Sequence, residues 1–451
     1  MAKKKQIELT IEEKLQNALV PKEEQPYKIP NNWCWVRLDF LLKEICNGTT
    51  IKQNKEGKTA RVTRIESLQN NTIDFNRIGN IVNESLIKDK DWYIEGDIIV
   101  SHINSIEHVG KSAVITRDML PLVHGMNLLR LRLNNICNSQ FFQLYTRTTD
   151  YKKSIVNRVN RAVNQVSINQ KQLCSLEIPI TNLKEQQRIV NRIESLFAKL
   201  DRAKELIENT LAQFEQNKMA ILHKAFTGEL TAKWRKENNI DLSSWKKCEL
   251  KEVFKVVKDK YNPQTENQIV NYIGLENIET SKGIISKNNS SEVKSIKTKF
   301  KKDDVLYGKL RPYLNKHDVV NFDGICSTDI LVFRFNDINT AKYINYYFNL
   351  PMFIQYAVEN SSGINLPRVS EKTISKYKIS LPTIEEQQEI INILDKLLAK
   401  YNKIKNLEQQ LEKIELLKKA ILAKAFRGEL GTNNPDEESA ENLLKEILAE
   451  K

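Results

Sequence analysis

Two glycine-lysine-hydroxyl triplets are the residues in this sequence whose types could cradle a phosphate. They are GKT at 57–59 and GKS at 110–112. A P-loop needs a further glycine five residues before the second one, so that the backbone can turn around the phosphates. Lys52 and Ser105 stand at those two places. Neither triplet therefore predicts a nucleotide site.

Other catalytic patterns fail in the same way. The sequence contains no GxGxxG, GxSxG or HExxH motif. An amino-methyltransferase would show Asn or Asp followed by two prolines and an aromatic residue, but Asn262-Pro263 continues into Gln264. The six cysteines form no CxxC pair, so neither zinc nor a disulfide framework is indicated. We expect a binding protein with no catalytic residue, no metal and no cofactor of its own.

The stretch YGKLRPYLNKHD at 307–318 is the best candidate for binding. It interleaves basic and aromatic side chains, and Pro312 predicts extended backbone at the residue before it. Such a loop can offer donors to base edges and phosphates. The alternative is a basic hairpin tip of the kind found on many soluble domains. The candidate DNA-binding residues of this second half are Lys258, Lys260, Tyr261, Lys309, Arg311, Tyr313 and Lys316.

The first half has its own polar stretches, and they differ in chemistry. VSHINSIEHVGK at 100–111 lies at the place of the YGKLRP stretch, and NGTTIKQNK at 47–55 and KTARVTR at 58–64 are further candidate tips. Related scaffolds with different polar tips should read different sequences. The candidate DNA-binding residues here are Thr49, Lys52, Arg61, Arg64, Ser101, His102, Asn104 and Lys111.

Composition agrees with a polyanionic partner. The 451 residues carry a net charge of +13, although the end from Glu429 onward is acidic, so the body is more basic than the total suggests. A basic body suits a polyanionic partner such as a nucleic acid. The start has Lys and Glu where a signal peptide needs an apolar core, and no run of about 18 apolar residues follows. We expect a cytoplasmic protein without a membrane partner.

A long internal repeat organises the chain. AILHKAFTGEL at 220–230 returns as AILAKAFRGEL at 420–430, and the preceding stretch at 184–208 matches 385–409. Apolar residues in each copy alternate at spacings of four and three, which predicts a long amphipathic helix with a coiled-coil seam. One residue is missing from the second copy near Ile404, and we expect the helix to absorb this change. Gly228 and Gly428 predict left-handed caps at the helix ends.

The segments before the two helices are also related. GDIIVSHI at 96–103 aligns with DDVLYGKL at 303–310, and LLRLRL at 128–133 aligns with ILVFRF at 330–335. These runs predict short strands between polar turns. The fold class is therefore α+β: two globules alternating with two long, antiparallel coiled-coil helices in a pseudo-two-fold repeat. The expected parts are an N-terminal helical segment 1–30, globule 31–183, helix 184–230, linker 231–243, globule 244–383, helix 384–430 and acidic tail with a short helix 431–451.

The whole chain resembles the specificity subunit of type I restriction-modification systems. The residues that carry the resemblance are TIEEKLQNALVPKEEQPYKIPNNWCWVRL at 10–38, the two EQQ-headed helices with their KAFTGEL and KAFRGEL ends, and GKLRPYLNK in the second globule. The resemblance implies that the globules are target recognition domains, each binding one half of a split DNA target. It also implies that the paired helices hold the domains at a fixed separation, and that the segment TGELTAKWRKENNI tunes the spacer.

The resemblance implies partners as well. Two methyltransferase subunits, which bring S-adenosylmethionine and methylate adenine, would dock on the helices, and restriction or motor subunits using ATP and magnesium would join them. The specificity subunit itself catalyses nothing. The matching helix ends are the candidate partner-binding residues: Lys224, Phe226, Glu229, Lys424, Phe426 and Glu429.

Two other classes of protein stay open at the level of the sequence. A coiled-coil scaffold would explain the helices, but it would leave the basic and Asn-rich tips of the globules unexplained. A DNA enzyme with an unrecognised site would act on DNA as a purified chain. Neither the target bases nor the spacer length follows from the residues.

Overall fold

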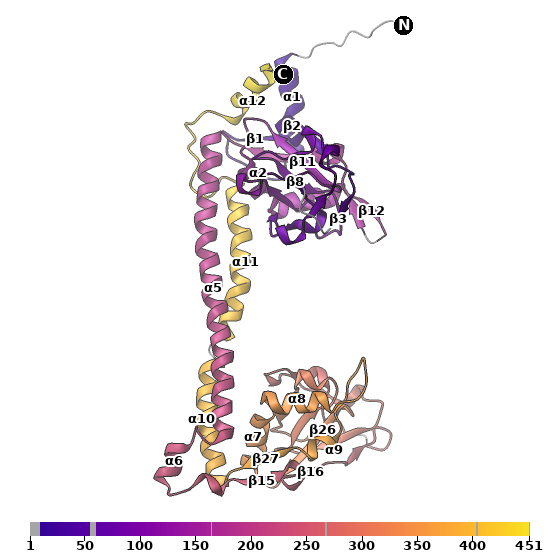
Figure 1. The fold of residues 1–451 in the computed structure, drawn as a ribbon, viewed down its shortest axis with the longest axis vertical. Helices are drawn as coiled ribbons and strands as arrows, with labels where there is room; N and C mark the ends of the chain where they lie inside the picture. The colour runs from indigo at the N-terminus through magenta and orange to yellow at the C-terminus, as the bar shows by residue number, and fades with distance from the viewer. Residues whose placement is uncertain (1–9, 55–59, 164, 267, 403–404, 451) are drawn as a thin grey trace. The chain divides into compact units, whose positions relative to one another are not determined.

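The protein divides into two compact units. The computed structural model describes residues 10–54, 60–163, 165–266, 268–402 and 405–450. The first unit comprises Met1–Glu205 with Gln410–Lys451, and the second comprises Leu206–Gln409 (Figure 1). The boundary falls within the longest helix, α5 (Leu183–Thr227), which has 45 residues. Each unit thus combines one globule with segments of the long helices.

The globule of the first unit is built on a four-stranded antiparallel sheet with the order β10-β8-β11-β2. Smaller sheets have the orders β1-β14, β12-β13-β9, β3-β7-β4 and β5-β6. The strands are β1 (Cys34–Arg37), β2 (Leu42–Asn47), β3 (Gln53–Asn54), β4 (Ala60–Val62), β5 (Leu68–Gln69), β6 (Thr72–Ile73), β7 (Gly79–Ile81), β8 (Ile98–Ser101), β9 (Ile103–Asn104), β10 (Ser112–Val114), β11 (Leu128–Leu133), β12 (Asn160–Ala162), β13 (Gln165–Ser167) and β14 (Glu177–Ile180). The helices are α1 (Ile11–Ala18), α2 (Ser139–Thr146), α3 (Thr149–Arg158), α4 (Gln170–Cys174) and α12 (Ala440–Glu450).

The globule of the second unit repeats this plan. Its four-stranded sheet has the order β16-β26-β23-β24, and its other sheets are β15-β27, β17-β22-β25-β18-β21 and β19-β20. The strands are β15 (Lys246–Glu249), β16 (Phe254–Val256), β17 (Lys260–Tyr261), β18 (Asn271–Ile273), β19 (Ile278–Glu279), β20 (Gly283–Ile284), β21 (Asn288–Asn289), β22 (Lys297–Phe300), β23 (Val305–Gly308), β24 (His317–Val319), β25 (Gly324–Cys326), β26 (Ile330–Phe335) and β27 (Lys378–Leu381). The helices are α6 (Ala232–Glu237), α7 (Ile338–Tyr347), α8 (Pro351–Glu359), α9 (Glu371–Ser375) and α10 (Ile384–Asn402).

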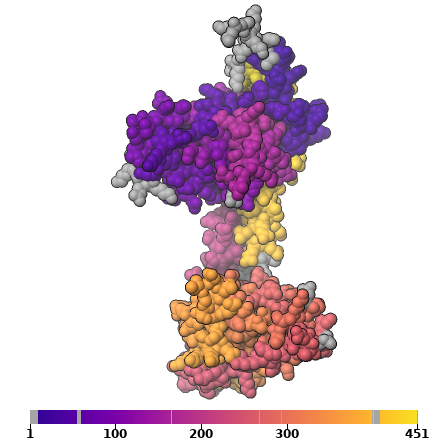
Figure 2. Space-filling view, turned by 90° about the vertical axis from the view of Figure 1, so that its right-hand side faces the viewer, coloured from indigo at the N-terminus to yellow at the C-terminus, as the bar shows by residue number. Residues whose placement is uncertain are grey.

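Each four-stranded sheet is buried on both faces, which explains its continuous apolar strands. In β8, Ile98 and Val100 enter one hydrophobic cluster whereas Ile99 enters another. The matching strand β23 divides Val305 and Leu306 between two clusters in the same way. Successive side chains of a strand point to opposite faces, so an uninterrupted apolar run fits a sheet covered on both sides. Figure 2 shows the second globule as one continuous packed surface. The α+β repeat predicted from the sequence is confirmed.

The long helices end as their glycines predict. Gly228 and Gly428 both adopt positive φ angles, +83° and +73°, which a residue without a Cβ tolerates at a helix end. In the first unit α5 runs antiparallel to α11 (Lys405–Ala425). Two ion pairs show this direction, since Asp201 pairs with Lys418 whereas Lys204, farther along α5, pairs with Glu415, which comes earlier in α11. The second long helix is described as α10 and α11. The one-residue deletion in the second copy of the repeat was expected near Ile404. Residues 403–404, between these two helices, lie outside the described part of the chain.

The EQQ head of each long helix is buried against the segment that follows the other helix. In the first unit the Thr432 hydroxyl donates to Glu185 Oε1 at 2.6 Å. In the second unit the Thr231 hydroxyl donates to Glu386 Oε1, also at 2.6 Å. The repeated sequence motifs therefore meet each other inside each unit, which is a structural reason for their recurrence.

The segment 231–243, expected to be a linker, is folded and packed. It contains α6, and Arg235 of this helix is buried beside Glu386 with an N–O distance of 2.5 Å. An insertion that lengthens this segment would have to keep Thr231 and Arg235 in place. The acidic tail is likewise packed, since α12 contacts α1 and buries Leu444 and Leu448 in the core of the first unit.

Candidate nucleic-acid interface

In the first unit, the chain leaves the central sheet through a polar loop. Ser101 ends β8, and His102 and Asn104 follow it, with Asn104 on β9. The Asn104 amide donates to Ser101 Oγ at 3.2 Å, and the backbone N–H of Ser101 donates to the carbonyl of Lys111 at 2.9 Å. The structure therefore brings these four predicted residues together. His102, Asn104 and Lys111 are half-buried, so part of each side chain reaches the surface.

The second unit places Lys309 and Arg311 at the same point, after β23. The Lys309 Nζ lies 3.9 Å from Asp329, and the Lys316 Nζ donates to the carbonyl of Leu275 at 2.7 Å. Arg311 and Tyr313 are exposed. Among the residues that the structure describes, no side chain forms an ion pair with Arg311. Its guanidinium is thus available to a ligand in solution.

The backbone at Arg311 differs from the prediction. Pro312 was expected to hold it extended, but Arg311 is left-handed with φ 53° and ψ 64°. Its N–H donates to the carbonyl of Pro367 at 2.7 Å, and Pro312 begins a short 3-10 turn, Pro312–Leu314. A non-glycine residue in this region costs about 1–3 kcal/mol and persists only where surrounding contacts impose it. The cross-loop hydrogen bond is such a contact.

A hairpin that was not predicted lies beside each loop. In the first unit β13 pairs with β9, so Val166 lies opposite Asn104. In the second unit Arg368 bridges to Leu310, and the N–H of Val369 donates to the carbonyl of Lys309 at 3.0 Å. The first hairpin pairs β12 with β13, and in the second unit a single bridge between Ser362 and Arg368 closes the corresponding turn. Their signal in the sequence is an apolar residue among Asn, Arg and Gly, in NRAVNQ and SGINLPR.

Four other predicted residues of the first unit surround the sheet β3-β7-β4. The N–H of Thr49 donates to the carbonyl of His124 at 2.8 Å, and Lys52 is exposed. Arg61 donates to the carbonyls of Met119 and Pro121 at 3.2 and 3.1 Å, and Arg64 pairs with Glu66 at 3.1 Å. The GKT triplet at 57–59 and part of the KTARVTR stretch lie outside the described residues.

In the second unit Lys258 and Lys260 are exposed. Lys258 pairs with Glu371 at 2.7 Å, and the Lys260 Nζ lies 3.4 Å from Thr298 Oγ1. Glu371 begins α9, directly after the RVS segment at 368–370, so this ion pair ties Lys258 to the segment that carries Arg368.

Two predicted DNA contacts must be corrected. Ser101 and Tyr261 are buried, so neither presents its side chain to a ligand. The Tyr261 hydroxyl donates to the carbonyls of Glu266 and Gln268 at 3.0 and 3.3 Å, so it is engaged within its own unit. The Ser101 hydroxyl accepts from Asn104 and orients it. Both residues position the surface instead of forming it.

His317, within the predicted basic stretch, is buried and not presented to solvent. Its Nδ1 lies 2.7 Å from Asn345 Oδ1, and its Nε2 lies 3.1 Å from the Asn315 amide nitrogen. These partners suit a neutral ring that donates from Nδ1 and accepts at Nε2. Burial lowers the pKa of His317 from 6.5 to about 4.

This burial predicts a pH dependence of stability. Between about pH 6.5 and pH 4 the unfolded chain binds a proton on His317 that the folded chain does not, so stability falls as the pH falls through this window. We expect the second unit to lose about 2 kcal/mol between pH 7 and pH 5 through this residue. Urea unfolding at the two pH values should show a smaller loss for His317→Gln than for the parent chain. An equal loss in both proteins would contradict the prediction.

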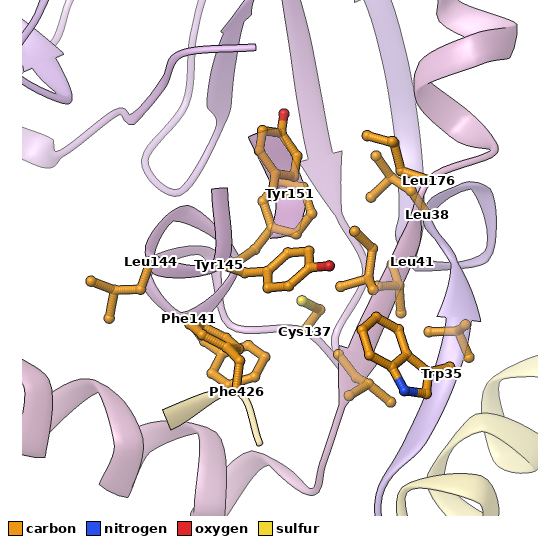
Figure 3. Close-up of a cluster of buried hydrophobic side chains, with 14 of the residues drawn as sticks. Trp35, Leu38, Leu41, Cys137, Phe141, Leu144, Tyr145, Tyr151, Leu176 and Phe426 are labelled. Atoms are coloured by element: carbon orange, nitrogen blue, oxygen red, sulfur yellow. The ribbon is translucent and has the colours of Figure 1, made fainter. Parts of the chain in front are cut away.

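The predicted partner-binding residues separate into two groups. Lys224, Glu229, Lys424 and Glu429 are exposed and stay candidates for a partner. Phe426 is wholly buried and packs on Phe141, with ring centroids 5.0 Å apart (Figure 3). Phe226 is half-buried between Tyr343 and Tyr347, at 5.1 and 4.9 Å. The prediction that Phe426 contacts a partner is therefore wrong, because its side chain fills a core, and Phe226 is largely engaged within its own unit.

Taken together, the fold defines a duplicated α+β protein in which each copy presents a polar loop and a hairpin and is followed by a long helix. The family model described as Type I restriction modification DNA specificity domain matches residues 31–213 and 243–416. The chain belongs to this family.

Individual relatives agree with this membership. The chain is 29% identical over 414 residues to the putative type I restriction enzyme MjaX specificity subunit of Methanocaldococcus jannaschii, covering 89% of this chain and 95% of the relative. It is 28% identical over 311 residues to the type I restriction enzyme EcoDI specificity subunit of Escherichia coli, covering 62% of this chain and 70% of the relative.

Two solved structures share the fold. The HsdS subunit from Thermoanaerobacter tengcongensis matches with a TM-score of 0.54 and 18% identity over 90% of this chain and 100% of its own. A chain from a structure of complex assembly and conformational transition in the type I R-M system matches with a TM-score of 0.67, 18% identity and the same coverage. Across the described residues of the present protein, no helix has the length and apolar character needed to cross a membrane.

Proposed function

We infer that this chain is the DNA-recognition subunit of a type I restriction-modification complex. Each globule reads one half of a bipartite target, and the long helices set the distance between the halves. The observation that carries this proposal is the matched position of two chemically different loops, with His102 and Asn104 after β8 and Lys309 and Arg311 after β23. A duplicated scaffold with different polar tips suits two unequal half-sites.

The same duplication supports two docking sites for identical partners. Lys224 and Glu229 in the second unit recur as Lys424 and Glu429 in the first, and all four are exposed. Two equivalent surfaces in one chain can recruit two copies of one partner. The partners in the proposal are two methyltransferase subunits that bring S-adenosylmethionine, and motor subunits that use ATP and magnesium. The chain itself holds no cofactor and catalyses no reaction.

Co-expression with its methyltransferase tests this function. A host without adenine methylation should acquire methylated adenines in one bipartite motif with two unequal halves, as read by methylome sequencing. The purified chain alone should neither methylate nor cleave DNA. Assembly with the methyltransferase without sequence-specific DNA binding would favour the scaffold alternative. Methylation or cleavage by the chain alone would favour the enzyme alternative.

Arg311 offers a test of direct base reading. If its guanidinium bonds one base in a bidentate manner, Arg311→Ala should weaken binding by about 1–3 kcal/mol and relax one position of one half-site. Arg311→Lys keeps the positive charge but cannot form the bidentate hydrogen bond, so it should also weaken the sequence preference at that position. Lys302→Ala is the matched control, because exposed Lys302 precedes the opposite end of β23. Uniform weakening on all sequences would instead identify a phosphate contact.

A further inference from the structure

The hairpin of the first unit holds an apolar residue in its turn. β12 and β13 pair from Asn160 with Ser167 to Ala162 with Gln165, which places Val163 directly after the last paired residue of β12. The Val163 side chain is 91% exposed. Figure 1 shows this hairpin, labelled β12, projecting from the sheets of its globule.

The second unit has a longer turn with the same property. Ser362 and Arg368 exchange backbone hydrogen bonds of 3.0 and 2.8 Å, and this pair closes a turn that includes Ile364. The Ile364 side chain is 101% exposed, and Gly363 before it has a φ of +104°. Each globule therefore presents a strongly exposed branched apolar side chain on the turn next to its polar loop, and in the second unit Leu366 of the same turn is 44% exposed as well.

The surroundings of both turns are basic and hydrogen-bonding. Arg161 is exposed on β12, next to the turn of the first hairpin. In the second unit Arg368 and Lys309 share one counter-charge, because Asp329 lies 3.3 Å from Arg368 and 3.9 Å from Lys309. Positive groups beside a protruding apolar residue suit a polyanion with an apolar interior, which describes stacked bases between phosphate strands.

The size of these tips argues against a protein partner. A stable protein interface uses about 20–30 residues on each side, whereas each turn offers one or two apolar residues on a narrow hairpin. A single branched side chain is large enough to enter between two base pairs. DNA-bending proteins use Ile, Leu, Phe and Met in this way, and they unstack one base step.

We propose that Val163 and Ile364 are wedges, each of which inserts into a base step of the half-site bound by its own globule. This inference rests on the proposed function. The wedge unstacks the step and kinks the duplex, while the neighbouring loop contacts the base edges and phosphates. Part of the sequence preference at each half-site then comes from how readily that step opens, because pyrimidine-purine steps unstack most easily.

The test uses the full chain assembled with its methyltransferase and duplexes carrying 2-aminopurine at successive positions of the target, apart from the adenine that becomes methylated. The fluorescence of 2-aminopurine rises when the base is unstacked. We expect a rise at one step in each half-site with the parent protein. Val163→Ser should abolish the rise in one half-site, Ile364→Ser should abolish it in the other, and each should weaken binding by on the order of tenfold.

Matched variants test whether the effects come from base insertion. They would otherwise come from misfolding or from the loss of any exposed apolar side chain. Val163→Ile and Ile364→Val should keep both signals. Ile94→Ser changes another exposed apolar residue of the first unit, before the opposite end of β8, and should change neither signal. All of these residues are exposed, so thermal unfolding should match that of the parent chain.

The outcomes distinguish this inference from the proposed function. Failure of the parent complex to bind any bipartite sequence would remove the proposed function itself. Specific binding with no rise in fluorescence at any step would overturn the wedge and leave the proposed function standing. A rise that survives both serine substitutions would also overturn it.

Discussion

Glu386→Gln should lower the free energy of unfolding of the second unit by about 3–5 kcal/mol, the usual cost of leaving a buried charge without its partner. Glu386 is fully buried and accepts three donors: Thr231 Oγ1 at 2.6 Å, Arg235 Nη1 at 2.5 Å and Trp245 Nε1 at 2.8 Å. The substitution removes the negative charge but keeps the shape. Among the described residues, the other hydrogen-bond acceptors of buried Arg235 are both neutral, namely the Thr231 hydroxyl and the carbonyl of Gly228.

The first unit supplies the matched control. Glu185 occupies the equivalent position and is also buried, but its partner Arg188 is more exposed and pairs in addition with Glu437 at 2.6 Å. Glu185→Gln should therefore cost less than Glu386→Gln. Urea unfolding, monitored by tryptophan fluorescence, measures the loss of stability in both variants. Trp245 reports directly on the site around Glu386. Equal losses, or no loss for Glu386→Gln, would show that these networks do not stabilise the helix junctions as their geometry indicates.

The repeated motifs show how far the sequence alone could go. The EQQ heads and the glycine-terminated ends were visible as a duplication, and their spacing predicted long helices with caps at Gly228 and Gly428. Their contact with each other was not visible, because the residues that meet, such as Thr231 and Glu386, lie far apart in the chain. A motif that recurs for internal packing has the same appearance in a sequence as one that recurs for partner docking.

The candidate site was predicted in part for a similar reason. Strand ends followed by polar residues marked the loops at His102 and Lys309, because a short apolar run and the polar break after it are local signals. Burial of Ser101 and Tyr261 depends on long-range contacts that no local pattern records. The hairpins were missed because an isolated Val163 or Ile364 in a polar turn resembles any surface loop until its exposure is known.

Phe426→Ala should destabilise the first unit by about 3–5 kcal/mol, because removing a buried aromatic ring costs both its transfer energy and a cavity. Phe426 packs against Phe141 and Tyr145, with ring centroids at 5.0 and 5.1 Å. Its neighbours belong to α2, on the globule, so the ring joins the end of α11 to the recognition domain. Phe426→Leu, which fills most of the volume, should cost less than about 1.5 kcal/mol.

Phe226 distinguishes a core role from a docking role at the matching helix end. It is half-buried, so Phe226→Ala should destabilise the free chain less than Phe426→Ala does. Urea unfolding of the free chain and assembly with the methyltransferase are measured for all three variants. A docking residue would leave the free chain stable and weaken assembly. For Phe426 we expect the reverse: Phe426→Leu should assemble normally while Phe426→Ala unfolds at lower urea, because the ring has no surface left for a partner to touch.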